Sequence, residues 1–188
     1  MNEEQLLVER ILQGDLHAYQ HLVKRYERLV VHMIGRLIHQ KEDVEDLCQD
    51  VFLMIYKKLP SYNFESKLST WIATIAYRTA INYLKKKRLP IHTPASEAAF
   101  EQEMQPTEES PESLLSKKDW QAFIHRQIAS LPLQYRTVLT LFHLEEFNYA
   151  EIEATTGMPE GTVKSYLFRA RKLLKEKLMV VLQKEKVL

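Results

Sequence analysis

The sequence of 188 residues has very little cysteine and glycine and contains no long apolar run. Cys48 is its only cysteine, which excludes an intrachain disulfide and favours a reducing compartment. No stretch approaches the roughly 18 unbroken apolar residues of a membrane-spanning helix. The acidic N-terminus, MNEEQLLVERIL, resembles neither a signal peptide nor a membrane anchor. These absences predict a soluble, cytoplasmic protein.

Strands are not predicted, because only 4 glycines are present and β-branched residues do not alternate with polar ones. Apolar residues instead recur with the period of an α-helix, as Leu22, Tyr26 and Val30 do. Apolar residues make up 45% of the chain, which is enough to build buried cores. The sequence therefore predicts an all-α fold made of two small helical domains.

The net charge of +1 hides three blocks of different charge. Lys/Arg and Asp/Glu number 14 and 11 in residues 1–88, 2 and 7 in 89–119, and 10 and 7 in 120–188. Four prolines interrupt the acidic block before residue 113. Because so acidic and proline-rich a stretch cannot bury enough apolar surface to order itself, we predict a flexible linker over 90–112. The two domains are then expected at 1–89 and 113–188.

The C-terminal stretch NYAEIEATTGMPEGTVKSYLFRARK has the organisation of a helix-turn-helix. Asn148 and Glu151 have the spacing of a capping box, Gly157 suits the residue that ends a helix, and Pro159 suits the start of the next helix. Polar residues are expected to face outward on that second helix: Thr162, Lys164, Ser165, Tyr166, Arg169 and Lys172. Such a face favours the DNA major groove, although a solvated basic helix is the alternative.

The stretch LSTWIATIAYRTAINYLKKKR, residues 68–88, predicts one helix with two working faces. One face is expected to join the bundle core: Ile72, Ala76, Thr79 and Tyr83. The other mixes aromatic, amide and cationic groups: Trp71, Ile75, Arg78, Asn82, Lys85 and Lys86. That mixture suits single-stranded nucleic acid, and the polar NFESKLST before it is expected to form a loop that can hold an unstacked base. Packing of Trp71 against the preceding helix is the alternative.

A third surface is expected on the helix that precedes residues 68–88, in the stretch KEDVEDLCQDVFLMIYKKL (41–59). The expected core stripe of this helix is formed by Val44, Leu47, Cys48, Val51 and Ile55. On the opposite face, four residues follow the spacing i, i+3, i+4 and i+7: Asp46, Gln49, Asp50 and Leu53. Acidic side chains there repel DNA phosphates, so the functional interpretation is a protein partner with a basic surface. A solvated acidic face is the other interpretation.

Together these segments resemble the extracytoplasmic-function (ECF) group of bacterial sigma factors over nearly the whole chain. The resemblance is carried by GD at Gly14–Asp15, DVEDLCQDVF at 43–52, KLSTWIATIAYRTAINYLKKKR at 67–88, LPLQYRTVLTL at 131–141, and YAEIEATTGMPEGTVKSYLFRARKLLK at 149–175. It implies sigma region 2 at 1–89 and sigma region 4 at 113–188. It also implies an alternative sigma factor with core RNA polymerase, promoter DNA and an anti-sigma factor as partners, and no direct insertion into a membrane.

The resemblance further implies roles for the three surfaces. Core-polymerase binding falls to Asp46, Gln49, Asp50 and Leu53. Recognition and melting of the promoter −10 element falls to Asn63, Lys67, Ser69, Thr70, Trp71, Arg78, Asn82 and Lys86. Recognition of the −35 element falls to Thr162, Lys164, Ser165, Tyr166, Arg169 and Lys172. Many members carry Arg or His where this chain has Tyr166, which is a departure from the family pattern.

Two other classes of function remain open at this point. A transcriptional regulator that uses the helix-turn-helix without docking on polymerase would leave the Asp46/Asp50 surface and the Trp71 face without a role. An enzyme is weakly supported, since His17 and His21 lie one helical turn apart but no third metal ligand is near them in the sequence. We expect no enzymatic activity, no catalytic residue, no metal and no cofactor.

Overall fold

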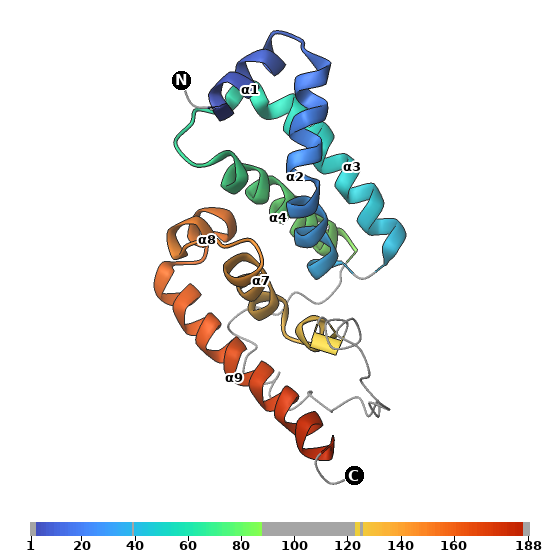
Figure 1. Cartoon of the computed structure of the whole chain (residues 1–188), viewed down its shortest axis with the longest axis vertical. Helices are drawn as coiled ribbons and strands as arrows, with labels where there is room; N and C mark the ends of the chain where they lie inside the picture. The colour runs from blue at the N-terminus through green and yellow to red at the C-terminus, as the bar shows by residue number, and fades with distance from the viewer. Residues whose placement is uncertain (1–2, 39, 88–122, 125, 186–188) are drawn as a thin grey trace.

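The computed structural model describes residues 3–38, 40–87, 123–124 and 126–185, and every regular element within them is helical (Figure 1). The expected linker at 90–112 lies outside the described residues, as do residues 113–122 of the second expected domain. The described helices form two groups, one from the N-terminal half of the chain and one from the C-terminal half. The prediction of an all-α protein with two helical domains is confirmed.

The first domain contains α1 (Glu3–Leu12), α2 (Leu16–Leu37), α3 (Lys41–Lys58) and α4 (Leu68–Lys86). A short 3₁₀ turn, Leu59–Ser61, follows α3. The long helix α2 packs against each of the other three helices, and α3 also packs against α4. In Figure 1 this domain is the blue-to-green half of the molecule.

The turn between α1 and α2 depends on two adjacent residues. Gly14 has φ +89°, a left-handed conformation that side chains rarely adopt. Asp15 is the N-cap of α2, where its Oδ1 accepts a hydrogen bond from the backbone N–H of Ala18 at 3.0 Å. The Arg10 guanidinium contacts the other carboxylate oxygen of Asp15 at 2.6 Å. The cap therefore fixes where α2 begins and how α1 approaches it.

The core of the first domain follows the helical period seen in the sequence. Leu22, Tyr26 and Val30 of α2 are all buried, and Val51 and Ile55 of α3 are fully buried. Burying one large aliphatic side chain stabilises a fold by about 1.5–3 kcal/mol, so a repeat of such residues specifies which face of each helix turns inward. The periodicity therefore predicted these core faces correctly.

The second domain contains α7 (Leu133–His143), α8 (Tyr149–Thr156) and α9 (Glu160–Glu185), preceded by helical residues at 126–129. The long helix α9 packs on both α7 and α8. Its core includes fully buried side chains from each helix: Leu141, Ile152 and Leu167. In Figure 1, α9 runs away from the first domain toward the C-terminus.

The two domains are in direct contact. Helix α2 packs against α7, and α4 packs against α8, so the buried apolar residues of both domains form one continuous cluster (Figure 1). His32 Nδ1 of α2 lies 2.8 Å from Glu145 Oε1, in the segment between α7 and α8. Helical periodicity predicts none of these contacts between the domains, because it indicates only which face of a helix is buried.

Candidate nucleic-acid interface

The helix-turn-helix has the local geometry that its sequence predicts. Asn148 Oδ1 accepts a hydrogen bond from the Glu151 backbone N–H at 2.9 Å, and Glu151 Oε2 accepts one from the Asn148 N–H at 2.8 Å. Gly157 ends α8 in the left-handed conformation with φ +76°. The capping box and the glycine stop are confirmed. They fix α8 at a defined angle to α9, which begins at Glu160.

We expect Asn148→Ala to lower the free energy of unfolding by about 1 kcal/mol, because it removes the side-chain acceptor that caps α8. Urea denaturation followed by circular dichroism measures this change. Asn82→Ala is the matched control, since Asn82 is exposed within α4. A loss no larger for Asn148→Ala than for the control would show that the cap contributes nothing measurable.

The outward face of α9 presents several polar and basic side chains to solvent. Val163, Leu167 and Ala170 are buried against α7 and α8. On the other side of the helix the exposed predicted site residues are Lys164, Ser165, Arg169 and Lys172, and Thr162 is half-buried. The predicted separation of an apolar and a polar face on α9 is thus present for these residues.

Tyr166 corrects the prediction, since it faces inward. It is 4% exposed, and its ring packs edge-on against Tyr135 with the ring centroids 5.2 Å apart. At about 100° per residue, Tyr166 lies on the same side of α9 as Val163 and Ala170, which makes it part of the buried stripe. The prediction placed Tyr166 outward because it counted only the aliphatic residues of α9 in the buried stripe, but the Tyr166 ring packs between α7 and α9.

Phe168 was missed by the sequence analysis. It is 70% exposed and lies on the outward side of α9, among the polar residues of that face. Phe168 follows Ser165 by three residues, so the two side chains share one face of the helix, and this spacing was the available signal.

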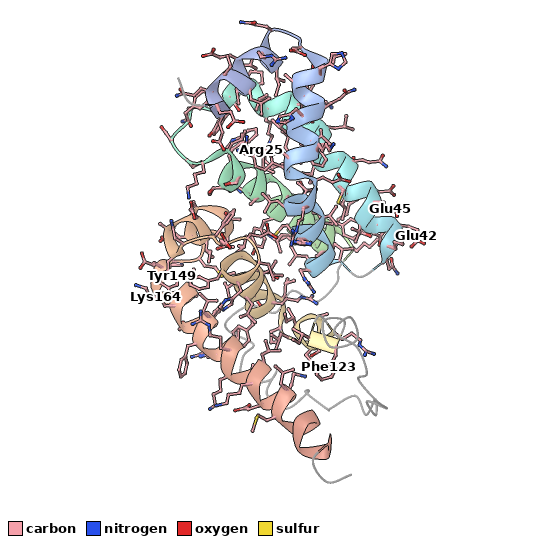
Figure 2. The ribbon with its side chains drawn as sticks, viewed as in Figure 1. Arg25, Glu42, Glu45, Phe123, Tyr149 and Lys164 are labelled. Atoms are coloured by element: carbon pink, nitrogen blue, oxygen red, sulfur yellow. The ribbon has the colours of Figure 1, made fainter. Side chains whose placement is uncertain are left out.

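Lys164 is held on the surface of the second domain by two neighbours. Its Nζ lies 2.5 Å from Glu160 Oε1 and 5.2 Å from the centre of the Tyr149 ring. Figure 2 shows Tyr149 and Lys164 side by side near the start of α9. The hydrogen bond to Glu160, together with the charge of that carboxylate, raises the pKa of Lys164. Lys164 is therefore cationic and positioned at the N-terminal end of the outward face.

Helix α4 has an exposed polar side, as its sequence predicts. Arg78, Asn82 and Lys86 are exposed, whereas Ile72 and Ala76 are fully buried. The two faces of α4 are therefore present along most of its length.

Ile75, which the sequence placed on the open face of α4, corrects that prediction because it is 7% exposed and belongs to the core. Helix α4 packs against α2, α3 and α8, so its apolar surface is covered over a wider arc than a bundle of four helices requires.

Trp71 keeps part of its side chain exposed. It is half-buried and packs against the core, with its ring 5.2 Å from that of Tyr62. The Tyr62 ring in turn lies 4.6 Å from Phe64, which is 42% exposed and adopts a left-handed φ of 60°. These three rings, which we call the aromatic cluster, join the loop to the start of α4. The aromatic spacing in YNF was the available signal for Tyr62 and Phe64.

The remaining predicted residues near the start of α4 differ in accessibility. Thr70 is 2% exposed, so its side chain lies inside the domain and cannot contact a ligand in this arrangement. Ser69 is half-buried, whereas Asn63 and Lys67 are exposed. Lys67 Nζ already lies 2.7 Å from Glu151 Oε1 of the second domain.

The acidic surface on α3 is fully accessible. Its four predicted residues, Asp46, Gln49, Asp50 and Leu53, are all exposed. Leu53 is 59% exposed, and Tyr56 continues the apolar end of the stripe toward the end of α3. Glu42 and Glu45 add negative charge near the N-terminal end of the same helix (Figure 2). The exposed side of α3 thus begins with acidic residues, continues with Leu53 and Tyr56, and ends with Lys57 and Lys58.

His17 and His21 are both exposed on α2, and the described residues contain no group of three or more His, Cys, Asp or Glu side chains arranged to hold a metal ion. Among the described helices, none has the length and apolar character required to cross a membrane.

Comparison with known proteins matches both domains. The family models for sigma-70 region 2 and sigma-70 region 4 match residues 22–89 and 124–174. The ECF RNA polymerase sigma-E factor of Escherichia coli K12 is 36% identical over 186 residues, covering 96% of this chain and 97% of that protein. The RNA polymerase sigma-H factor of Pseudomonas aeruginosa is 33% identical over 186 residues, covering 96% of each chain.

A solved structure has the same fold. It contains the sigma factor RpoE in complex with the anti-sigma factor NepR from Bartonella quintana. The TM-score is 0.64 at 22% identity, and the match covers 86% of this chain and 97% of the other.

The helical fold, the helix-turn-helix and the two matched regions together define a bacterial sigma factor of the sigma-70 type. Such proteins are transcription initiation factors rather than enzymes. Within that class, the chain belongs to the ECF group. It is an alternative sigma factor that binds core RNA polymerase and promoter DNA and directs promoter-specific initiation.

Proposed function

We propose that this ECF sigma factor divides promoter recognition between its two domains. The domain at 1–89 binds core polymerase and captures the −10 element, and the domain at 113–188 reads the −35 element. The observation that carries the proposal is the presence of two separate exposed basic faces, one on α4 beside the aromatic cluster and one on the second helix of a helix-turn-helix. A regulator that used the helix-turn-helix alone would need only the second face.

The −35 element is read by α9 in the major groove. Arg169 and Lys172 are exposed and can reach guanine edges or phosphates, while Ser165 can bond to several base edges. Thr162 and Lys164 lie near the N-terminus of α9, the part of a recognition helix that contacts base edges in the major groove. Tyr166 supports this surface from inside by packing on α7.

The −10 element is captured as single-stranded DNA at the start of α4. The exposed ring of Phe64 and the partly exposed ring of Trp71 offer stacking surfaces for unpaired bases, and stacking contributes about 1–3 kcal/mol per base. Asn63, Ser69 and Asn82 supply hydrogen-bonding groups. Lys67, Arg78 and Lys86 supply phosphate contacts. Thr70 makes no direct contact with DNA in this proposal, because its side chain is buried beneath this surface.

Core polymerase binds the surface on α3. Asp46, Gln49 and Asp50 offer an acidic and amide edge to a basic partner, and Leu53 offers an apolar anchor beside it. A charged rim next to an apolar residue is the usual composition of a protein–protein interface. This surface has no plausible role in binding DNA, whose phosphates it would repel.

The same proposal covers partner, location and activity. The solved RpoE structure contains an anti-sigma factor, and we propose that a partner of this kind holds the present chain inactive. Because core polymerase is its working partner, the chain acts in the cytoplasm and has no enzymatic activity of its own. The segment at 90–112 serves as the tether between the two DNA-reading domains.

Run-off transcription with purified core polymerase over a promoter library tests the proposal. We expect transcripts from a small set of promoters that share −35 and −10 sequences, and none from core polymerase alone. Tight binding of duplex promoter DNA by the isolated chain, together with no promoter-specific transcript in the presence of core polymerase, would favour the regulator instead.

A further inference from the structure

Two cations of α9 each lie against an aromatic ring of a neighbouring helix. Lys164 Nζ is 5.2 Å from the centre of the Tyr149 ring, at the start of α8 (Figure 2). The Arg171 guanidinium carbon is 5.1 Å from the centre of the Phe142 ring, near the end of α7. The two rings stack on each other, with their centres 5.4 Å apart and their planes inclined by 20°. These four residues, which we call the cation–aromatic ladder, therefore join α9 to both of the helices that it packs on in its own domain.

Arg171 belongs to none of the three proposed surfaces, although its side chain is held in place. It is exposed, and its Nε–H donates a hydrogen bond to His143 Nε2 at 3.1 Å. Partial burial and the charge of Arg171 lower the pKa of His143, so the imidazole is uncharged at neutral pH and can accept that bond. The imidazole and the Phe142 ring orient the guanidinium without neutralising it. Arg171 therefore offers a positive charge in a defined position.

Arg171 and Lys164 lie along one edge of α9. They are seven positions apart, by subtraction of 164 from 171, which corresponds to about 20° around the helix axis and about 10 Å along it. Lys164 is part of the face that is proposed to read the −35 element. Arg171 continues the same edge two turns farther along the helix.

The place of the ladder in the helix-turn-helix favours the DNA backbone as its ligand. A recognition helix lies in the major groove, and the first helix of the motif crosses the backbone beside it. Tyr149 begins the first helix and Lys164 lies near the start of the second, so this end of the ladder lies where the backbone is crossed. Because phosphates border the groove on both sides, the strand that passes Lys164 also runs toward Arg171.

The chemistry of the Arg171 site suits a phosphate. A guanidinium can bind a phosphate through two parallel N–H···O bonds, and the two terminal nitrogens can form them while Nε–H remains bonded to His143. A long cationic side chain loses rotamer freedom when it binds a ligand. The ring and the imidazole restrict Arg171 beforehand, so less freedom is lost when the phosphate arrives.

We propose that Arg171 is a further promoter-binding residue of this chain, which contacts a backbone phosphate beside the −35 element, and that Phe142 and His143 position it. The inference rests on the proposed role of α9 in reading the −35 element. It adds a contact that is independent of sequence, and it gives a role to two residues of α7, which precedes the helix-turn-helix.

The test uses core polymerase loaded with the full chain. Its binding to a fluorescein-labelled duplex promoter from the run-off selection is measured by anisotropy over a range of salt concentrations, at a temperature too low for melting. We expect Arg171→Ala to weaken binding by about three- to tenfold. The slope of log K against log salt should become shallower by about 0.9, the value for one phosphate contact. The loss should be equal on a duplex with an altered −35 element, because a phosphate carries no sequence information.

Phe142→Leu and His143→Leu test the positioning roles. Each removes one support of Arg171 but leaves its charge, so affinity should fall by about two- to threefold with no change in the salt slope. His143→Gln should keep most of the affinity, because its amide oxygen can accept the same hydrogen bond. All three substitutions should have no further effect when Arg171→Ala is present. An undiminished effect in that background would show a structural role only and would overturn the positioning assignment.

Lys177→Ala is the matched control, since it removes the same charge from α9 about 120° around the helix axis from Arg171. Unchanged affinity in Arg171→Ala, a loss confined to the unaltered −35 element, or an equal loss in Lys177→Ala would overturn the inference. Weaker binding of Arg171→Ala to core polymerase itself, with DNA binding by the loaded enzyme unchanged, would assign the ladder to an acidic protein surface and overturn it as well.

A separate variant tests the proposed −35 role on which the inference rests. Arg169→Ala should reduce the discrimination between the two duplexes, because Arg169 is exposed on the base-reading face of α9. Unchanged discrimination would remove the base-reading role of Arg169, whereas the result for Arg171→Ala concerns the phosphate contact alone. The two failures are therefore distinguishable in the same assay.

Discussion

Asp50→Lys is expected to weaken binding to core RNA polymerase by about tenfold or more, while leaving the free energy of unfolding unchanged. Asp50 lies between Asp46 and Leu53 on the exposed stripe of α3, so a cation there faces the basic partner surface directly. Its side chain is exposed, and substitutions at such positions usually change stability by less than about 0.5 kcal/mol. Fluorescence anisotropy of the labelled chain titrated with core enzyme measures the affinity.

Glu45→Lys is the matched control for Asp50→Lys. It makes the same charge change on the same exposed helix, but Glu45 lies at the edge of the surface, about 40° around the helix axis from Gln49 and about 140° from Asp50 at about 100° per residue. A general electrostatic attraction between the chain and polymerase would make both substitutions equally harmful. A docking surface centred on Asp50 predicts a clearly smaller effect of Glu45→Lys, and equal losses would refute the assignment.

Arg78→Ala is expected to lower the rate of open-complex formation by about tenfold, because it removes an exposed cation from the proposed single-strand surface. Core-polymerase binding and the unfolding free energy should remain unchanged, since Arg78 projects from α4 into solvent. Arg28→Ala, at an exposed position of α2 outside the assigned surfaces, is the control. Permanganate footprinting of the melted promoter with limiting polymerase measures the rate.

Trp71→Ala should behave differently from Arg78→Ala, for a reason visible in the fold. The Trp71 ring is half-buried against Tyr62, so its removal costs packing as well as a stacking surface. We expect a loss of open-complex formation together with a fall in unfolding free energy of about 1–3 kcal/mol. A fall in the unfolding free energy with no change in open-complex formation would show that Trp71 serves only the packing of the domain.

Much of the site was predictable because its causes are local. The capping box of Asn148 and Glu151, the left-handed Gly157 and the buried Val163 and Leu167 all follow from interactions within one or two helical turns. Such interactions are encoded by residues three or four positions apart in the sequence. The boundaries and inner faces of the helices could therefore be predicted before any tertiary contact was known.

The orientation of single residues at the margin of a face was not predictable in the same way. Tyr166 is buried because Tyr135 of a different helix lies 5.2 Å from it, and Phe168 remains exposed because no described helix covers that side of α9. Thr70 and Ile75 are buried, although Ser69, Trp71 and Thr74 beside them on α4 are only half-buried. Angle alone places these residues on a boundary, and the neighbouring helix decides on which side each one falls.

The sequence by itself determined the helices, their inner faces and the helix-turn-helix, because helical periodicity and capping act over a few residues. Only the tertiary structure decided that α8 rests on α4 and that Lys67 faces Glu151. Those residues are 84 positions apart, by subtraction of 67 from 151, and no local pattern relates them. Their contact depends on how two separately folded apolar surfaces meet, which is a property of the packed domains together.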